Sequence, residues 1–259
     1  MPTTDSVGYT GKSKLMDNYG WVQNSSNLST VRDVVDLIPD EGIDHNTLMR
    51  SIYFSRQEKG DLKKKWTWDA RCRIKAVCAT GMAELDRSIA GYKLTTLGIA
   101  LKAAPYSTTL FKGKRILSPE EKEIFKKGLL SNPPVIRVLS ILNESRRNGN
   151  IPLSKYDVGS QLGFVGDIGF THFEAEYVAL MNKSFNDKEG DADKWARTII
   201  SWLSQVGWVV KGKSAEIYGK TLPRYTTTFE VDRILQYGAK STIKYVPQEM
   251  LCSEHHAFP

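Results

Sequence analysis

The sequence of 259 residues predicts a mainly α-helical protein with small β wings, because one order of elements occurs in it twice. Each copy consists of a helix that ends at a glycine, a short strand, a polar loop, a returning strand and a closing helix. This is the order of elements in a winged-helix unit, a helix-turn-helix-like fold. We therefore expect two winged-helix domains in tandem, although the two copies share little sequence identity.

The first copy begins with an amphipathic helix over 29–38, whose apolar residues recur at helical spacing and which Pro39 closes. A second helix over 71–79 ends at Gly81. The following segments complete the unit as a strand, a polar loop, a returning strand and the start of the closing helix, at 82–85, 86–91, 92–95 and 96–101.

The second copy repeats this order after a helix from about 193 to 206, which meets Gly207. Alternating and β-branched residues predict the two strands, and the segment between them reads as one long polar loop. The strand, the loop, the returning strand and the closing helix are expected at 208–210, 211–222, 224–229 and 230–237.

The boundary between the copies follows a helix that opens at Ser118-Pro119-Glu120-Glu121, the pattern of a capping box with proline at the first helical position. This helix runs to about Leu130, and the prolines at 133 and 134 mark its end. We therefore expect an extended N-terminal arm (1–28), a first winged-helix domain with its connecting helix (29–131), a second winged-helix domain (132–240) and a C-terminal tail (241–259).

The composition excludes several classes of protein. Hydrophobic residues make up 41% and charged residues 25%, as in an ordinary globular protein. No run of about 18 apolar residues occurs, and the start of the chain lacks the apolar region of a secretory signal. Three cysteines without a CxxC pair disfavour a disulfide framework and a zinc ribbon. We expect a protein of the reducing cytoplasm with no membrane partner.

The net charge points toward nucleic acid without requiring it. Lysine and arginine total 36 against 29 acidic residues, which gives a formal charge of +7. Such an excess is typical of a nucleic-acid binder. A basic protein with no such partner is equally compatible with charge alone.

The helix over 193–206 has two unlike faces. One face carries apolar residues that we expect to be buried, namely Trp195, Ile199, Trp202, Leu203 and Val206. The opposite face carries Lys194, Arg197, Ser201 and Ser204, and cations in the first turns of a helix suit the major groove of DNA. Lysine and arginine read guanine, asparagine reads adenine and glutamate accepts from cytosine. The alternative is an exposed helix face preceded by a solvated loop.

A second basic segment combines lysines with tryptophans, as Lys63-Lys64-Lys65-Trp66-Thr67-Trp68. We expect the three lysines to contact phosphates. The indoles can stack on a base or wedge into a groove, or they can fix the start of a helix to the core.

No catalytic motif is recognisable. A metal-nuclease signature can be written from Pro39-Asp40 and Glu120-Glu121-Lys122, but its second part lies inside the capping box. No histidine has HExxH spacing, and GxSxG does not occur. We expect no catalytic and no metal-binding residue in this chain.

Several segments resemble the DNA-recognition part of the FokI-like type IIS restriction endonucleases. They are Tyr19-Gly20-Trp21-Val22-Gln23-Asn24, the region 133–164, the run 189–197 and the ending 239–251. The resemblance covers most of 19–251 in the same order, and GWVQN and the ExxxDK[WY]AR run are its most specific motifs. The stretch between Asn24 and Trp68 is much shorter than in the family, so contacts that lie there cannot be transferred.

This resemblance implies roles for individual residues. Gln23 and Asn24 match base-contacting positions of an N-terminal arm, and Trp68 matches an aromatic DNA contact of the first domain. Four residues of the second domain match its base-reading segment, namely Asn186, Glu189, Lys194 and Arg197. In the family a separate Mg²⁺-dependent nuclease module follows the recognition domains, and the tail at 241–259 would lead toward it.

The resemblance and the residues together predict sequence-specific binding of an asymmetric double-stranded DNA site. We expect a monomer that binds DNA in the bacterial cytoplasm without a cofactor of its own. The parent enzyme would be a Mg²⁺-dependent site-specific deoxyribonuclease, so whether the chain counts as an enzyme stays open. A winged-helix transcriptional regulator and a complete small metal-dependent nuclease are the alternatives.

Overall fold

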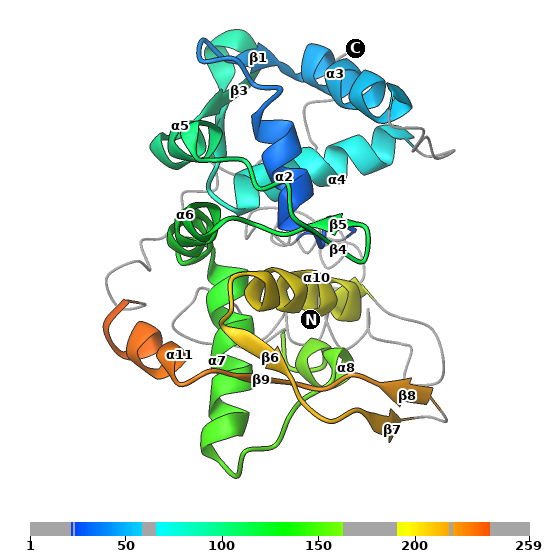
Figure 1. Cartoon of the computed structure of the whole chain (residues 1–259), viewed down its shortest axis with the longest axis vertical. Coiled ribbons are helices and arrows are strands. Elements are labelled where there is room, and N and C mark those ends of the chain that lie inside the picture. Colours follow the sequence, from blue (N-terminus) through cyan, green and yellow to red (C-terminus); the bar gives the residue numbers. More distant parts are fainter. Residues whose placement is uncertain (1–21, 23, 59–65, 163–190, 218–219, 239–259) are drawn as a thin grey trace, which may run out of the picture.

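The structure is a computed structural model that describes residues 22, 24–58, 66–162, 191–217 and 220–238. Within these residues the chain is mainly helical, as predicted, and its strands form four small sheets. The first half of the chain lies at one end of the molecule and the second half at the other, with the helix α10 (Asp191–Gln205) running between them (Figure 1). None of the described helices is both long enough and apolar enough to cross a lipid bilayer.

The described residues of the first half form four helices around one small sheet, which joins its strands in the order β1-β3-β2. The expected strand pair is confirmed, because Leu85 lies opposite Tyr92 in an antiparallel register. Residues 45–58, for which the sequence analysis made no prediction, form a helix. The elements are α2 (Leu28–Val35), β1 (Ile43–Asp44), α3 (His45–Glu58), α4 (Trp66–Ala79), β2 (Ala83–Asp86), a 3₁₀ turn (Arg87–Ile89), β3 (Gly91–Leu94) and α5 (Thr96–Ala103).

Helix α2 ends earlier than the expected 29–38, but its apolar face is buried as predicted. Val31, Val34, Val35 and Ile38 are each at most 2% exposed. Arg32 of the same helix is also buried, because its guanidinium donates hydrogen bonds to the last carbonyls of α5, including Lys102 O at 2.9 Å. Arg32 of α2 therefore satisfies carbonyl groups at the C-terminal end of a second helix, α5.

A hairpin and a helix join the two halves. The hairpin pairs β4 (Leu110–Phe111) with β5 (Lys114–Arg115), and its turn places Lys112 and Gly113 at positive φ. The helix α6 (Pro119–Leu129) begins with the predicted capping box. Ser118 Oγ accepts from the amide of Glu121, and the carboxylate of Glu121 accepts from the amide of Ser118.

In the second half the predicted order of elements is present with one error. The strands β6 and β9 pair antiparallel, as expected for the strand and its return. The segment expected to be one long loop over 211–222 instead contains a second antiparallel hairpin, in which Ala215 lies opposite Leu222. The elements are α7 (Pro133–Arg147), α8 (Lys155–Gly159), α10, β6 (Val209–Lys211), β7 (Ala215–Ile217), β8 (Lys220–Leu222), β9 (Tyr225–Thr227), α11 (Glu230–Arg233) and one π turn (Ile234–Gly238).

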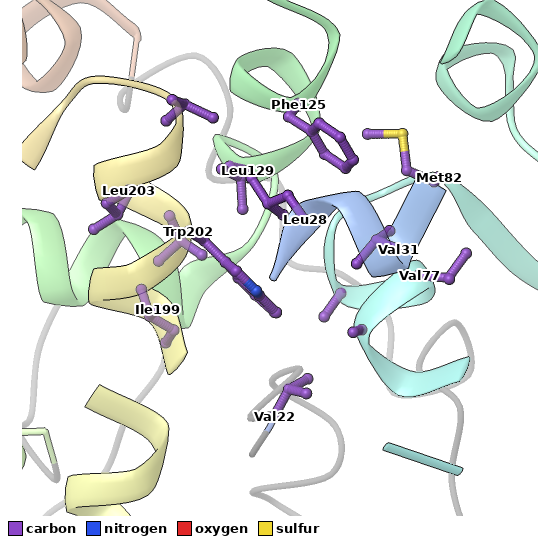
Figure 2. Close-up of a cluster of buried hydrophobic side chains, with 14 of the residues drawn as sticks. Val22, Leu28, Val31, Val77, Met82, Phe125, Leu129, Ile199, Trp202 and Leu203 are labelled. Carbon is purple, nitrogen blue, oxygen red and sulfur yellow. The ribbon is translucent and has the colours of Figure 1, made fainter. Parts of the chain in front are cut away.

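The two halves share a single hydrophobic core at α10. Trp202 of α10 is fully buried and lies near Leu28 and Leu129, which come from α2 and α6 (Figure 2). Val22 is 1% exposed and belongs to the same core. The expectation that residues 1–28 form an arm outside the core is therefore wrong at Val22 and at Leu28.

Candidate nucleic-acid interface

Helix α10 buries one face and exposes cations near its start, as the sequence predicts. The five apolar residues of its expected core face are all at most 7% exposed. Lys194 is half-buried and Arg197 is exposed, and these two residues are one turn apart. Asp193 is buried against α8, where a Cβ atom on Gly159 would come within 2.5 Å of Asp193 Oδ1. The close contact at Gly159 fixes the helix end that carries the two cations.

The second part of the predicted polar face is partly covered by the chain. Ser201 Oγ donates to Ser26 O at 2.8 Å, and Gln205 Nε2 donates to the same carbonyl oxygen at 2.7 Å. The backbone before α2 therefore covers the helix at Ser201, because its carbonyl groups find their donors there. Ser201 is therefore half-buried whereas Ser204 stays exposed, so the expected polar face is interrupted at Ser201.

The same docking places Asn24 next to α10. Val22 and Ser25 are buried on either side of it, and Trp202 Nε1 donates to Ser25 O at 2.7 Å. Asn24 itself is exposed and has a φ of 63°, a left-handed conformation that asparagine tolerates better than most residues. The structure thus holds one predicted arm residue at the surface, anchored through its neighbours to the helix of Lys194 and Arg197.

Trp68 lies in the first turn of α4 and is 43% exposed. Its side chain is therefore available to a partner. The cations after it differ in their environment, since Arg73 Nε pairs with Asp69 Oδ2 at 2.9 Å whereas Arg71 is exposed. Of the two alternatives for the tryptophans, exposure at Trp68 favours an external contact.

The remaining predicted contact residues lie outside the described part of the chain. They are Gln23, Lys63, Lys64, Lys65, Asn186 and Glu189. Of the ten predicted residues, the structure places Lys194 and Arg197 together on α10, Asn24 on the segment that docks against this helix, and Trp68 on α4 of the other half.

Two acidic residues in this part of the chain, Glu121 and Asp40, have structural partners. Glu121 is fully buried, and both of its carboxylate oxygens lie 2.8 Å from Arg115 Nη1. Asp40 Oδ1 accepts from Lys102 Nζ at 3.1 Å. Among the described residues, no three His, Cys, Asp or Glu side chains are grouped so that they could hold a metal ion. Glu121 therefore serves the capping box and an ion pair.

The β4–β5 hairpin beside α10 was not predicted from the sequence. Its tip exposes Leu110, Phe111 and Lys112. The signal was present as a Lys-Gly pair between short runs of apolar and basic residues, because lysine-glycine at two positive φ positions makes a tight hairpin turn.

The sequence and the fold relate this chain to the FokI-like type IIS restriction endonucleases. The particular relative is the type II restriction enzyme FokI of Planomicrobium okeanokoites, to which the chain is 30% identical over 155 residues. This match covers 56% of the chain and 24% of FokI, so the matched segment corresponds to about a quarter of that protein. No protein-family model matches the sequence.

Two solved structures share the fold. The restriction endonuclease FokI bound to DNA has a TM-score of 0.55 at 21% identity, over 86% of this chain and 48% of that one. The restriction endonuclease FokI has a TM-score of 0.56 at 22% identity, over 87% of this chain and 47% of that one. The chain thus has the fold of about half of the solved FokI chain.

Proposed function

We propose that this chain binds an asymmetric double-stranded DNA site in a sequence-specific manner, as the recognition part of a type IIS restriction endonuclease. The observation that carries the proposal is the start of α10, which presents Lys194 and Arg197 one turn apart while the opposite face is buried. Cations in the first turns of a rigidly held helix can reach base edges in the major groove. One of the solved structures that share the fold is FokI bound to DNA.

The order of elements supports two winged-helix domains within 29–131 and 132–240. In each half, a helix ending in a glycine with positive φ is followed by a strand and an antiparallel return strand. The hairpin β7–β8 lies at the position of a wing in the second half. The boundary near 131 separates the two units in sequence, although they share a core.

We assign base contacts to Gln23, Asn24, Asn186, Glu189, Lys194 and Arg197, an aromatic contact to Trp68 and phosphate contacts to Lys63, Lys64 and Lys65. Phosphate contacts fix the register of the protein on DNA, whereas base contacts determine the sequence that is bound. The chain would act as a monomer in the bacterial cytoplasm and recognise DNA only, while a Mg²⁺-dependent nuclease module of the parent enzyme would cut it.

Selection from a pool of random duplexes at about 150 mM salt tests the proposal, because non-specific electrostatic binding is weak under this condition. We expect the bound fraction to contain one short asymmetric motif. A palindromic motif would instead indicate a dimeric transcriptional regulator, and the absence of any enriched motif would overturn sequence-specific recognition. Incubation of the same chain with plasmid DNA and Mg²⁺ tests whether it also cuts.

Substitution of Arg197 then tests the role of α10. We expect Arg197→Ala to weaken binding of the selected duplex by about 1–3 kcal/mol and to relax the preference at one base pair. Arg197→Lys keeps the charge but loses the planar fork of donors, so it should relax the same preference. Arg147→Ala, which removes an exposed arginine at the far end of α7, is the control. An equal loss of affinity on every sequence would contradict base readout by Arg197.

A further inference from the structure

A groove of about 320 Å³ lies between the β4–β5 hairpin and α10. One wall carries Lys114 and Arg115 of β5 and Lys122 of α6, and the other carries Ser201 and Ser204 of α10. The hairpin lies directly beside α10 in the middle of the molecule (Figure 1). None of the described residues that line the groove carries a carboxylate. Its lining is therefore positively charged and suited to an anion.

The two lysines of the groove are not neutralised by the described part of the chain. Neither Lys114 nor Lys122 has an acidic side chain among the described residues within the distance of an ion pair. Lys126 of the same helix as Lys122 behaves differently, since its Nζ lies 3.0 Å from Glu123 and 3.2 Å from Glu230. The positive potential of the groove is thus not cancelled by neighbouring carboxylates.

Arg115 fixes the hairpin to the rest of the protein at the base of the groove. Its side chain is 8% exposed, its Nη1 pairs with Glu121 and its guanidinium lies 4.0 Å from the centre of the Tyr106 ring. Its Nε and Nη2 atoms are buried without a hydrogen-bond acceptor among the described residues. Buried guanidinium N–H groups normally have acceptors, so this arginine retains unused capacity for an anion at the groove.

The tip of the hairpin adds an aromatic group to these cations. Leu110 is 66% and Phe111 62% exposed, and Lys112 Nζ lies 5.5 Å from the centre of the Phe111 ring. Exposed apolar side chains next to lysines match the chemistry of a nucleic-acid strand, which presents phosphates together with sugars and base faces.

The groove also continues the surface of the proposed recognition helix. Ser201 and Ser204 lie on the same side of α10 as Lys194 and Arg197, one and two turns further along. We propose that the groove holds the sugar–phosphate backbone of one strand of the bound duplex. Lys114 and Lys122 each pair with a phosphate, and Phe111 packs against an adjacent sugar or base. This inference rests on the proposed DNA recognition.

The dependence of affinity on salt tests this assignment. The double variant Lys114→Ala/Lys122→Ala should lower the slope of log K against log[salt] by about 2, because each phosphate contact contributes about 0.9. The relative preference among sequences should stay unchanged, since phosphate contacts carry no sequence information. Lys127→Ala removes an exposed lysine of α6 that does not line the groove and should leave the slope unchanged. The double variant Lys114→Arg/Lys122→Arg keeps both charges and should retain the wild-type slope.

A second variant tests the aromatic contact. Phe111→Ala should weaken binding of the selected duplex about tenfold, whereas Phe54→Ala, at an equally exposed phenylalanine of α3, should not. Thermal unfolding of each variant verifies that the fold is intact. If the wild-type chain binds no duplex, the proposed function itself fails. If it binds and the groove variants retain its affinity and salt slope, the groove assignment is wrong and DNA recognition stands.

Discussion

His45 and Tyr92 form a polar contact between the start of α3 and the central strand of the first sheet. His45 Nδ1 lies 3.1 Å from the hydroxyl of Tyr92. Burial raises the pKa of Tyr92 to about 12, so its hydroxyl stays protonated and can donate to a neutral histidine. Burial, followed by the positive charge of Arg71, lowers the pKa of His45 below its usual 6.5, and the opposing effect of Asp44 is smaller.

The lowered pKa of His45 makes stability depend on pH. Between the folded pKa and 6.5 the unfolded chain binds more protons at this site, so the free energy of unfolding rises with pH in this interval. We expect this contribution to be lost as the pH falls below about 6.5. The substitution His45→Gln should remove this contribution. Urea unfolding of the wild type and the variant between pH 7.5 and 5 should therefore show a smaller loss of unfolding free energy in the variant. The same dependence of the unfolding free energy on pH in both proteins would contradict the lowered pKa of His45.

At the scale of elements, close backbone contacts fix where α6 meets the end of α4. A Cβ atom on Gly128 would lie 2.0 Å from Thr80 O and 2.7 Å from Met82 Cε. Asn132 Nδ2 donates to Ala79 O at 2.7 Å in the same region. The helix that joins the two halves is therefore in direct contact with the backbone of the first half.

The substitution Gly128→Ala tests this packing. We expect it to lower the free energy of unfolding by about 1–3 kcal/mol or more, because backbone must move to admit the methyl group. Gly113→Ala is the comparison, since nothing lies within 4 Å of its Cβ position and only the strain of a φ of 73° is added. Denaturant titration measures both. A Gly128 variant as stable as the wild type would show that the two segments are not in tight contact.

Local sequence patterns predicted many of the helices and strands. The spacing of Val31, Val34 and Val35 gave the buried face of α2, and the Ser118–Glu121 pattern gave the start of α6. The β7–β8 hairpin was missed because three-residue strands carry almost no periodic signal. At the site, helical periodicity correctly separated Arg197 from the core face of α10.

The covering of Ser201 could not be predicted from the sequence. It depends on Ser26, which is 175 residues away along the chain. No local pattern encodes such a contact, since it arises only when both halves have packed around α10. The same reason explains why Val22 and Ser25 were expected in a free arm and are buried instead.

For the whole molecule, Gln205 connects the two halves. Its Oε1 accepts from the amide of Leu28 at 2.9 Å, and its Nε2 donates to Ser26 O. We expect Gln205→Ala to lower the free energy of unfolding by about 1–3 kcal/mol, because the amide of Leu28 loses its acceptor and Ser26 O keeps only the donor from Ser201. Ser204→Ala, whose hydroxyl bonds within α10, is the matched control.

The shared core further predicts that the halves unfold together. Tryptophan fluorescence and far-ultraviolet circular dichroism should therefore give coincident urea transitions. Two separate transitions would mean that the core around Trp202 does not couple the halves.

The docking of Ser25 and Ser26 on α10 has a consequence for exchanging parts between relatives. A chimera joined at 131, where the sequence suggests a boundary, would combine the N-terminal segment of one parent with the α10 of the other. Ser25 and Ser26 would then meet a helix that was not selected to fit them. The unit that can be exchanged is discontinuous, because the second half must travel with the short segment that precedes α2.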